Sequence, residues 1–320
     1  MKEFIINKND SGQRLDKFIS KAVPKLPKSL TYKYIRLKRI KLNGKRCEIS
    51  QMLCEGDILN LYINDEFFEN PSEKSKKTIK TNTALPDIVY EDENILIVYK
   101  PTGMDVHHGA QKPDETLIDI IQAYLYSKKE YNPDEENSFS PAICNRIDRN
   151  TTGLVIAAKN AATLREINQC IREHRICKEY LCICSGNLPV RHSVETAYHR
   201  KGKHNSVEIS AKPAKDFKKI ITEYTVLEKK NNLMLVKINL ITGKTHQIRA
   251  HLSYLGAPLL GDGKYGNVKI NKQNQIFTQQ LCAYSLQFDF DEKSSLKYLN
   301  NRKFTVPKTG FGIHLFEKDN

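Results

Sequence analysis

The feature that most constrains this chain is a polar run at residues 145–153, Asn-Arg-Ile-Asp-Arg-Asn-Thr-Thr-Gly, directly before the apolar stretch 154–158. The run places one carboxylate, Asp148, between Arg146 and Arg149 in a predicted tight turn, beside a segment that must be buried. A charge removed from water is costly unless it is paired, so the fold has to bring a cation to Asp148. The spacing alone favours an ion-paired turn, and a chemical role for Asp148 is the alternative.

Charge is distributed unevenly along the chain. The 320 residues, enough for a sizeable core and more than one domain, contain 51 Lys and Arg against 37 Asp and Glu, a formal net charge of +14. Residues 14–46 alone carry twelve of the basic residues and a single acid, Asp16. This excess indicates a polyanionic partner, and nucleic acid rather than a membrane, because no basic stretch is joined to a long apolar face.

The sequence shows no apolar run of membrane-spanning length, and residues 1–10 lack the apolar stretch of a signal peptide. We therefore expect a cytoplasmic protein without a membrane partner, whose eight cysteines are reduced thiols. Four of them lie close together in sequence but lack the paired Cys-x-x-Cys spacing of zinc sites. The alternation of the last two along a predicted strand favours buried thiols over a metal site in the group Cys170, Cys177, Cys182 and Cys184.

Residues 12–63 have the pattern of a compact module. Helical spacing covers 14–22 and 28–38, and short strands are predicted at 40–43 and 58–63. The polar segment 64–84, which has no apolar period, is predicted to be a flexible linker.

A second domain is predicted over residues 85–308. Its apolar, β-branched runs predict strands, and short turns typical of hairpins join two pairs of them. Residues 127–140 are predicted to form a polar, acidic surface loop. The fold class is therefore α+β, a mixed and largely antiparallel sheet flanked by helices. The expected strands are 88–90, 95–99, 154–158, 180–184, 224–227 and 233–240, and the main helices are 116–128 and 161–174.

The N-terminal module resembles the S4 (S-four) RNA-binding domain. The resemblance rests on Arg-Leu-Asp-Lys-Phe at 14–18, a basic second helix, Leu-Asn-Gly at 42–44 and Gly-Asp at 56–57. Cations at helical spacing share a face that can follow a phosphate backbone. The expected RNA-binding surface consists of Arg14, Lys33, Arg36, Lys38, Arg39 and Lys41.

The polar run around Asp148 resembles the signature of the RluA-type pseudouridine synthases, which isomerise uridine in RNA. The family signature is His-Arg-Leu-Asp, two variable residues, Ser-Gly and an apolar strand, and this chain departs from it most clearly at Asn145. The resemblance makes Asp148 the catalytic carboxylate, acting on a uridine flipped out of the RNA. It also implies that Arg146 reaches into the space that the flipped base leaves.

Further stretches resemble other motifs of the same family. They are Lys-Pro-Thr-Gly-Met-Asp-Val-His at 100–107, Lys-Glu-Tyr at 178–180, Gly-Lys-Thr-His-Gln-Ile-Arg-Ala-His-Leu at 243–252, and a Gly-Asp…Tyr-Gly tail at 261–266. The resemblance implies that Tyr180 lies against the uracil, and that Arg249 keeps the nucleophile ionised. Four further residues are expected at the substrate, namely Ile248, Lys100, His107 and Lys244, the last replacing the usual arginine.

The implied reaction is an isomerisation, in which nothing is oxidised or hydrolysed overall, so no cofactor and no metal is expected. His246 and His251 could suggest a metal, but a spacing of five places them on different faces of a helix. The family combination implies large-subunit (23S) ribosomal RNA as the partner of a monomeric enzyme. Alternatives are a non-catalytic RNA-binding assembly factor and a transfer-RNA pseudouridine synthase, and the sequence leaves open whether Asp148 attacks the sugar or removes a proton from it.

Overall fold

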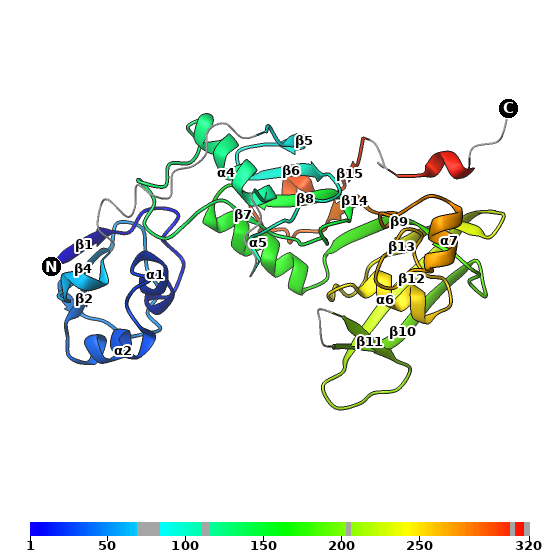
Figure 1. The fold of residues 1–320 in the computed structure, drawn as a ribbon. Coiled ribbons are helices and arrows are strands. Elements are labelled where there is room, and N and C mark those ends of the chain that lie inside the picture. The colour runs from blue at the N-terminus through cyan, green and yellow to red at the C-terminus, as the bar shows by residue number, and fades with distance from the viewer. Residues whose placement is uncertain (69–83, 110–114, 203–205, 308–310, 317–320) are drawn as a thin grey trace. The chain divides into compact units, whose positions relative to one another are not determined.

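The computed structural model describes residues 1–68, 84–109, 115–202, 206–307 and 311–316 (Figure 1). Contacts divide the chain into two compact units. Unit 1 comprises 1–85, 118–142 and 158–165, and unit 2 comprises 86–117, 143–157 and 166–320. The predicted domain bounds, 12–63 and 85–308, stay predictions.

The N-terminal module in unit 1 contains a small antiparallel sheet with two helices packed against it (Figure 1). Its core joins Leu15, Phe18 and Ile19 of the first helix to Leu59 and Leu61 of the sheet. The predicted helices and strands are present, together with a first strand that sequence analysis missed because only one of its four residues is buried. In chain order the elements are β1 (Lys2–Ile5), α1 (Leu15–Ala22), α2 (Lys28–Arg36), β2 (Ile40–Leu42), β3 (Lys45–Arg46) and β4 (Ile58–Leu61), with sheet order β1-β4-β2-β3.

The folded part of the module extends beyond residue 63. Residues Asp65–Phe67 form a 3₁₀ turn, η1, and the rings of Phe67 and Phe68 pack against the module core. The start of the predicted linker is therefore ordered, and residues 69–83 lie outside the described residues.

The remainder of unit 1 comes from the middle of the chain. Helix α4 (Leu117–Ser127) leads into the predicted surface loop, which is irregular but anchored to the N-terminal residues. The buried carboxylate of Asp10 accepts hydrogen bonds from Asn137 Nδ2 at 2.7 Å and Ser138 Oγ at 2.6 Å. The polar character of this loop thus serves internal hydrogen bonding as well as solvation.

Unit 2 is built around one mixed sheet, as predicted. Strand β14 pairs in parallel with β8. The pairs β10–β12, β12–β13, β13–β9, β9–β14 and β5–β6 are antiparallel. The order is β11-β10-β12-β13-β9-β14-β8-β6-β5, with β7 on β8 and β15 on β14. The strands are β5 (Asp87–Glu91), β6 (Ile95–Lys100), β7 (Ala142–Ile143), β8 (Thr152–Ala158), β9 (Ile176–Ser185), β10 (His192–Lys201), β11 (Val207–Ser210), β12 (Lys218–Lys230), β13 (Leu233–Asn239), β14 (Leu281–Phe288) and β15 (Lys303–Thr305).

Both predicted hairpins are confirmed, since β5 pairs with β6 and β12 with β13 in antiparallel register. Strands β10 and β11 were missed. Only Ala197 and His199 are buried in β10, so its polar sequence lacks the apolar run that marked the other strands. A strand with a largely exposed surface gives little hydrophobic signal.

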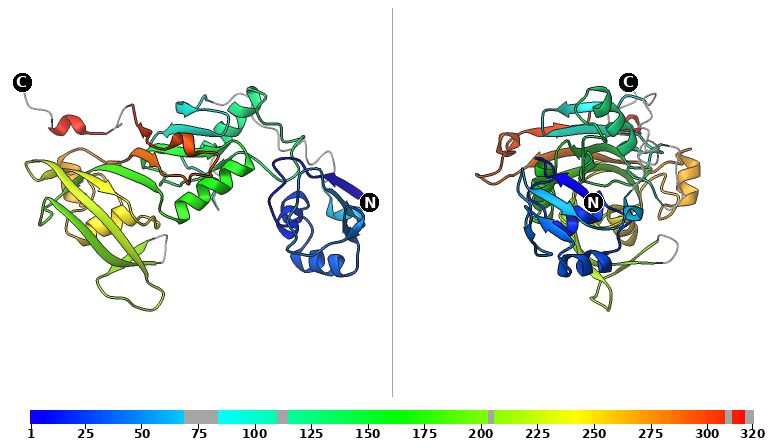
Figure 2. Two further views of the ribbon diagram at one scale, coloured as in Figure 1. Left: turned by 180° about the vertical axis from the view of Figure 1, so that it is seen from behind. Right: turned by 90° about the vertical axis from the view of Figure 1, so that its left-hand side faces the viewer.

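Helices cover parts of the large sheet (Figures 1 and 2). Helix α5 (Ala161–Arg172) packs Ile167 and Cys170 onto β6, β8 and β14, and α6 (Gln247–Tyr254) lies beside β11 and β12. Among the described residues, no helix is long and apolar enough to cross a membrane. The remaining short helices are α7 (Val268–Gln273), η2 (Lys297–Leu299) and η3 (Ile313–Phe316).

All eight cysteines are free thiols. Of the group that was examined for metal binding, Cys170, Cys182 and Cys184 are buried as predicted. Cys177 is exposed, because it lies near the start of β9, where the strand is only partly covered, whereas both faces are buried from Tyr180 onward.

Gly153 allows the parallel pairing of β8 with β14. It lies opposite Ala283 in the register and has a φ of 111°, and a Cβ atom placed there would come within 2.3 Å of the Ala283 carbonyl oxygen. No larger residue fits without moving the two strands apart. This explains why the polar run must end in glycine.

We expect Gly153→Ala to lower the free energy of unfolding by roughly 3 kcal/mol or more, because the strain of the positive φ adds to that of overpacking. Gly256→Ala is the matched control, since Gly256 also has a positive φ of 82° but nothing within 4 Å of its added Cβ. It should cost only about 1 kcal/mol. Urea unfolding of both variants measures the difference, and equal losses would contradict the steric argument.

Candidate active site

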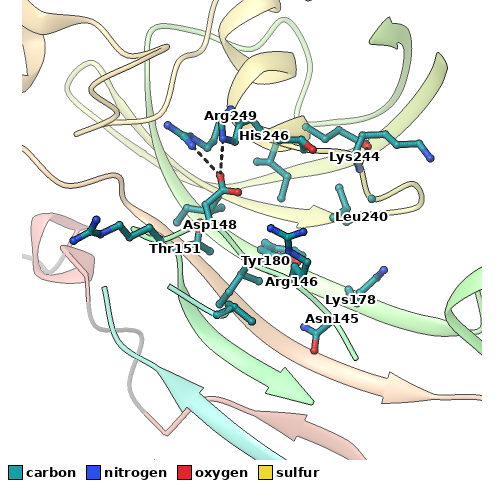
Figure 3. A pocket seen from close by; sticks show the side chains of 18 of the residues that line it. Asn145, Arg146, Asp148, Thr151, Lys178, Tyr180, Leu240, Lys244, His246 and Arg249 are labelled. Atoms are coloured by element: carbon teal, nitrogen blue, oxygen red, sulfur yellow. Dashed lines mark hydrogen bonds and ion pairs between the residues drawn. The ribbon is translucent and has the colours of Figure 1, made fainter. Parts of the chain in front are cut away.

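A pocket of about 630 Å³ opens in unit 2 where the predicted motifs meet (Figure 3). It is lined by residues of the loop after β6, the polar run before β8, strand β9, and the turn between β13 and α6. Segments more than 100 residues apart in sequence therefore contribute to one cavity. Of the predicted catalytic and substrate residues, the pocket is lined by Asp148, Tyr180, Arg249, Arg146, Ile248, His107 and Lys244, but not by Lys100.

Asp148 is paired with Arg249. The guanidinium donates from Nη1 to Asp148 Oδ2 at 2.8 Å. Within the described residues neither flanking arginine binds this carboxylate: Arg146 lies exposed on the pocket wall, and Arg149 donates from Nε to the Gly103 carbonyl at 3.0 Å. The ion-paired turn that spacing alone favoured is therefore wrong, because the local arginines point elsewhere and the partner comes from α6.

Arg249 is itself held by a second carboxylate. Asp262 accepts from Arg249 Nε at 2.7 Å and from Nη2 at 2.9 Å, a bidentate pair, and its side chain is 0% exposed. Burial would raise the pKa of Asp262, but the hydrogen bonds and charge of Arg249 outweigh it and lower that pKa. Burial opposes the charge of Arg249 too, yet Asp262 and Asp148 raise its pKa above the ordinary value. The guanidinium is thus fixed in orientation and in charge.

His246 approaches the same oxygen of Asp148 as Arg249 does. It occupies the left-handed conformation, φ 52°, at the start of α6, and its Nδ1 is 3.0 Å from the Tyr265 hydroxyl. Its Nε2 is 3.9 Å from Asp148 Oδ2. Burial lowers the pKa of His246, and the cation of Arg249 adds to this, while Asp148 opposes it.

His251 faces away from the pocket and lies within 3.0 Å of the Thr222 hydroxyl through Nδ1. The two histidines have different neighbours, as expected, but His246 is the N-cap of α6 rather than part of the helix, so only His251 occupies a helical face. No group of three His, Cys, Asp or Glu side chains that could hold a metal ion occurs among the described residues.

Tyr180 and Ile248 provide an apolar part of the wall. Tyr180 projects from the middle of β9 and is 6% exposed, and Ile248 is 5% exposed in the first turn of α6. Burial raises the pKa of Tyr180, and the negative charge of Asp148 raises it further, so the phenol stays neutral. Its ring is a surface against which a flat base could lie.

Lys100 lies behind the pocket wall. Its side chain is fully buried, and Nζ donates to the carbonyls of Pro101, Met104 and Arg149 at 2.8 to 2.9 Å. Burial lowers the pKa of Lys100 to about 8, with Asp105 and Asp148 opposing the shift. This lysine ties the loop after β6 to the polar run, and its predicted contact with substrate finds no support in this position.

Asn145, where the family has histidine, is also structural. Its amide accepts from the Ile156 N–H at 2.7 Å and donates to the Leu154 carbonyl at 3.2 Å. Both partners belong to β8. The side chain therefore fastens the start of the polar run to the buried strand.

Asp262 and Tyr265 belong to the Gly-Asp…Tyr-Gly tail at 261–266, and neither was predicted to be a site residue. The structure places Asp262 against Arg249, and the Tyr265 ring 5.3 Å from the guanidinium. The available signal was a single carboxylate in a glycine-rich segment after the Arg249 motif. That signal could not show that the carboxylate is fully buried.

We expect Arg249→Met to lose about 3–5 kcal/mol of stability, because Asp262 would be left as a buried charge without a partner. The double variant Arg249→Met/Asp262→Asn should recover most of this loss, since the amide keeps an oxygen for the Lys264 and Tyr265 N–H groups that bind Asp262. Urea unfolding of the single and double variants measures both effects. Wild-type stability in Arg249→Met would show that Asp262 does not depend on this guanidinium.

Known proteins with similar sequences identify the family of this chain. Residues 94–254 match the RNA pseudouridylate synthase family, and residues 13–59 match the S4 domain. An uncharacterised RNA pseudouridine synthase of Mycoplasma capricolum subsp. capricolum is 36% identical over 306 residues, which cover 94% of this chain and 96% of the relative. The ribosomal large subunit pseudouridine synthase C of Haemophilus ducreyi is 29% identical over 299 residues, 92% of this chain and 90% of the relative.

The fold also has a counterpart among solved structures. Human RNA Pseudouridylate Synthase Domain Containing 1 superposes with a TM-score of 0.55 at 23% identity, over 70% of this chain and 83% of the human one. That likeness concerns the fold, whereas the sequence matches above span both the module and the pocket. The chain therefore belongs to the RNA pseudouridylate synthase family, as an RluA-type isomerase with an N-terminal S4 domain.

Proposed function

We propose that this pseudouridine synthase acts on large-subunit (23S) ribosomal RNA, with Asp148 as its catalytic carboxylate and a flipped-out uridine as its substrate. The observation that carries the proposal is the pairing of Asp148 with Arg249 in the pocket, at 2.8 Å. The choice of RNA rests on the similarity to the Haemophilus ducreyi ribosomal enzyme.

The chemistry needs an ionised carboxylate beside the sugar. Isomerisation breaks the bond from the anomeric carbon to a ring nitrogen and forms a new bond to a ring carbon, so Asp148 either attacks that carbon or removes a proton from the sugar. Arg249 and His246 both approach Oδ2 of Asp148, and no described group hydrogen-bonds its Oδ1 (Figure 3). This leaves one oxygen for the substrate while the other is held.

The base would occupy the apolar part of the wall. A uridine stacked in RNA cannot reach Asp148, so it must turn out of the stack. The buried ring of Tyr180 and the side chain of Ile248 offer surfaces for its uracil. The exposed guanidinium of Arg146 at the pocket wall suits the gap left in the RNA, where it can stack and hydrogen-bond.

The S4 module would supply affinity by binding phosphates of the RNA backbone. Of the six predicted residues, Arg14 is already engaged by Asp16, with two hydrogen bonds of 3.0 and 3.1 Å. The others form no ion pair with a carboxylate in the described part of the chain, and Arg39 and Lys41 lie over the rings of Tyr34 and Tyr62. The remaining surface consists of Lys33, Arg36, Lys38, Arg39 and Lys41.

We expect Asp148→Asn to fold and bind RNA normally but to lose turnover by roughly a thousandfold or more, because it removes the charge that the reaction needs. Asp216→Asn, a similar change at an exposed position outside the pocket, is the control. Single-turnover formation of pseudouridine in transcribed large-subunit ribosomal RNA measures the effect. Substantial product from Asp148→Asn would overturn the role of Asp148.

The RNA substrate is tested separately in cells. Deleting the gene should remove pseudouridine from mapped positions of large-subunit ribosomal RNA, and expression of the wild-type protein should restore it. Loss confined to transfer RNA would contradict the proposed substrate while leaving the role of Asp148 intact.

We expect Lys33→Gln/Arg36→Gln to weaken RNA binding and to reduce the slope of log affinity against log salt by about 0.7 to 0.9 for each phosphate that is no longer bound. Arg14→Gln should change the slope less, since Asp16 already neutralises Arg14. Titrations at several salt concentrations measure the slopes. An unchanged slope in the double variant would show that this face of α2 does not bind RNA.

A further inference from the structure

Three lysines line the pocket that contains Asp148. They are Lys178 on β9, Lys201 at the end of β10, and Lys244 in the turn before α6. Figure 3 shows Lys178 beyond Tyr180 as seen from Asp148, whereas Lys244 lies near His246. None of the three forms an ion pair with a carboxylate of the described residues. Lys178 belongs to the Lys-Glu-Tyr motif at 178–180, and Lys201 lies outside all the motifs.

The backbone holds these lysines close together. The Leu240 N–H donates to the Lys178 carbonyl at 3.1 Å, which brings the turn after β13 beside β9. The buried imidazole of His199 lies with Nε2 2.9 Å from the Thr245 carbonyl, which ties the end of β10 to the same turn. Lys201 follows His199 by two residues, and Lys244 precedes Thr245. The three segments that carry these lysines are therefore joined to one another by hydrogen bonds.

The charge of the cluster is not balanced from within the pocket. Its lining contains two carboxylates, and both are near other cations: Asp148 binds Arg249, and Asp105 lies 3.9 Å from Arg149. Lys178 is half-buried, and burial lowers its pKa. A partly desolvated ammonium without a carboxylate is unfavourable unless an anion binds there.

We propose that Lys178, Lys201 and Lys244 form a phosphodiester-binding site for a linkage that adjoins the isomerised uridine. The assignment rests on the proposed function, in which the uracil lies against Tyr180. Alternate residues of a strand share a face, so Lys178 and Tyr180 point into the same cavity from β9 and can contact one nucleotide. Phosphate is the anion that RNA brings into such a pocket, and lysine binds it as a point charge. The site would fix the backbone while Asp148 acts on the sugar.

The test is a coupling cycle with a short RNA of about five nucleotides that contains one central uridine. Single methylphosphonate linkages, which carry no charge, are placed on either side of that uridine. Binding is measured in the Asp148→Asn background so that the RNA stays unreacted. In the protein with Lys178 intact, we expect one of the two neutral linkages to weaken binding roughly tenfold. In the Lys178→Gln protein, the same linkage should have little effect on binding. Equal penalties in both proteins at both linkages, or no penalty at either, would overturn the proposal.

The controls separate charge from structure. Lys178→Arg keeps the positive charge, so the neutral linkage should again weaken binding. If Lys178→Gln fails to fold, Lys201→Gln, a change at an exposed residue, should likewise abolish most of the penalty of the neutral linkage. Lys293→Gln removes the same charge at an exposed site outside the pocket and should leave the penalty unchanged. An affinity loss in Lys178→Gln that is independent of the neutral linkages would assign Lys178 to the base and overturn the phosphate assignment. Since the readout is binding, failure here is distinct from failure of the role of Asp148 or of the ribosomal substrate.

Discussion

The site depends on the guanidinium of Arg249, which binds two carboxylates at once. Asp262 takes Nε and Nη2, and Asp148 takes Nη1. The buried Asp262 is held as an anion chiefly by Arg249, with the N–H groups of Lys264 and Tyr265 adding to it, and the pair orients the remaining N–H of Arg249 toward Asp148. A buried ion pair of this kind adds little net stability, but it fixes the orientation of the guanidinium. It leaves one oxygen of Asp148 held and the other open to the pocket.

The sheet and its loops place this pair with little freedom. Gly153 lets β8 approach β14 in parallel register, and Asn145 fastens the preceding run to β8. Lys100 joins the run to the loop after β6 through three carbonyls. Lys100 and Asn145 occupy motif positions, and Lys100 was expected at the substrate, but here both side chains hydrogen-bond to the backbone. Asp148 is therefore positioned by side chains that hydrogen-bond to the backbone around it.

Charge is divided between two tasks. Near Asp148 the acids and bases are matched, which favours chemistry in a partly desolvated pocket. At Lys178, Lys201 and Lys244, and on α2 of the S4 module, the cations have no carboxylate partner among the described residues, which favours binding to a polyanion. Turnover and affinity are therefore expected to respond to different substitutions.

The sequence by itself determined helices α1, α2, α4 and α5, the two hairpins and the fold class, because apolar periodicity is a local property. The resemblance of its motifs to a known family singled out Asp148, Tyr180 and Arg249. The resemblance also implied Arg249 as the partner of Asp148, but spacing alone could not, because Arg249 is 101 residues away and reaches Asp148 only in the folded structure. The burial of Lys100 and the strand β10 were equally hidden, since a lysine and a polar strand carry no apolar signal. Only the tertiary structure decided which charged side chains form ion pairs and which cations have no carboxylate partner among the described residues, because pairing depends on distance in space.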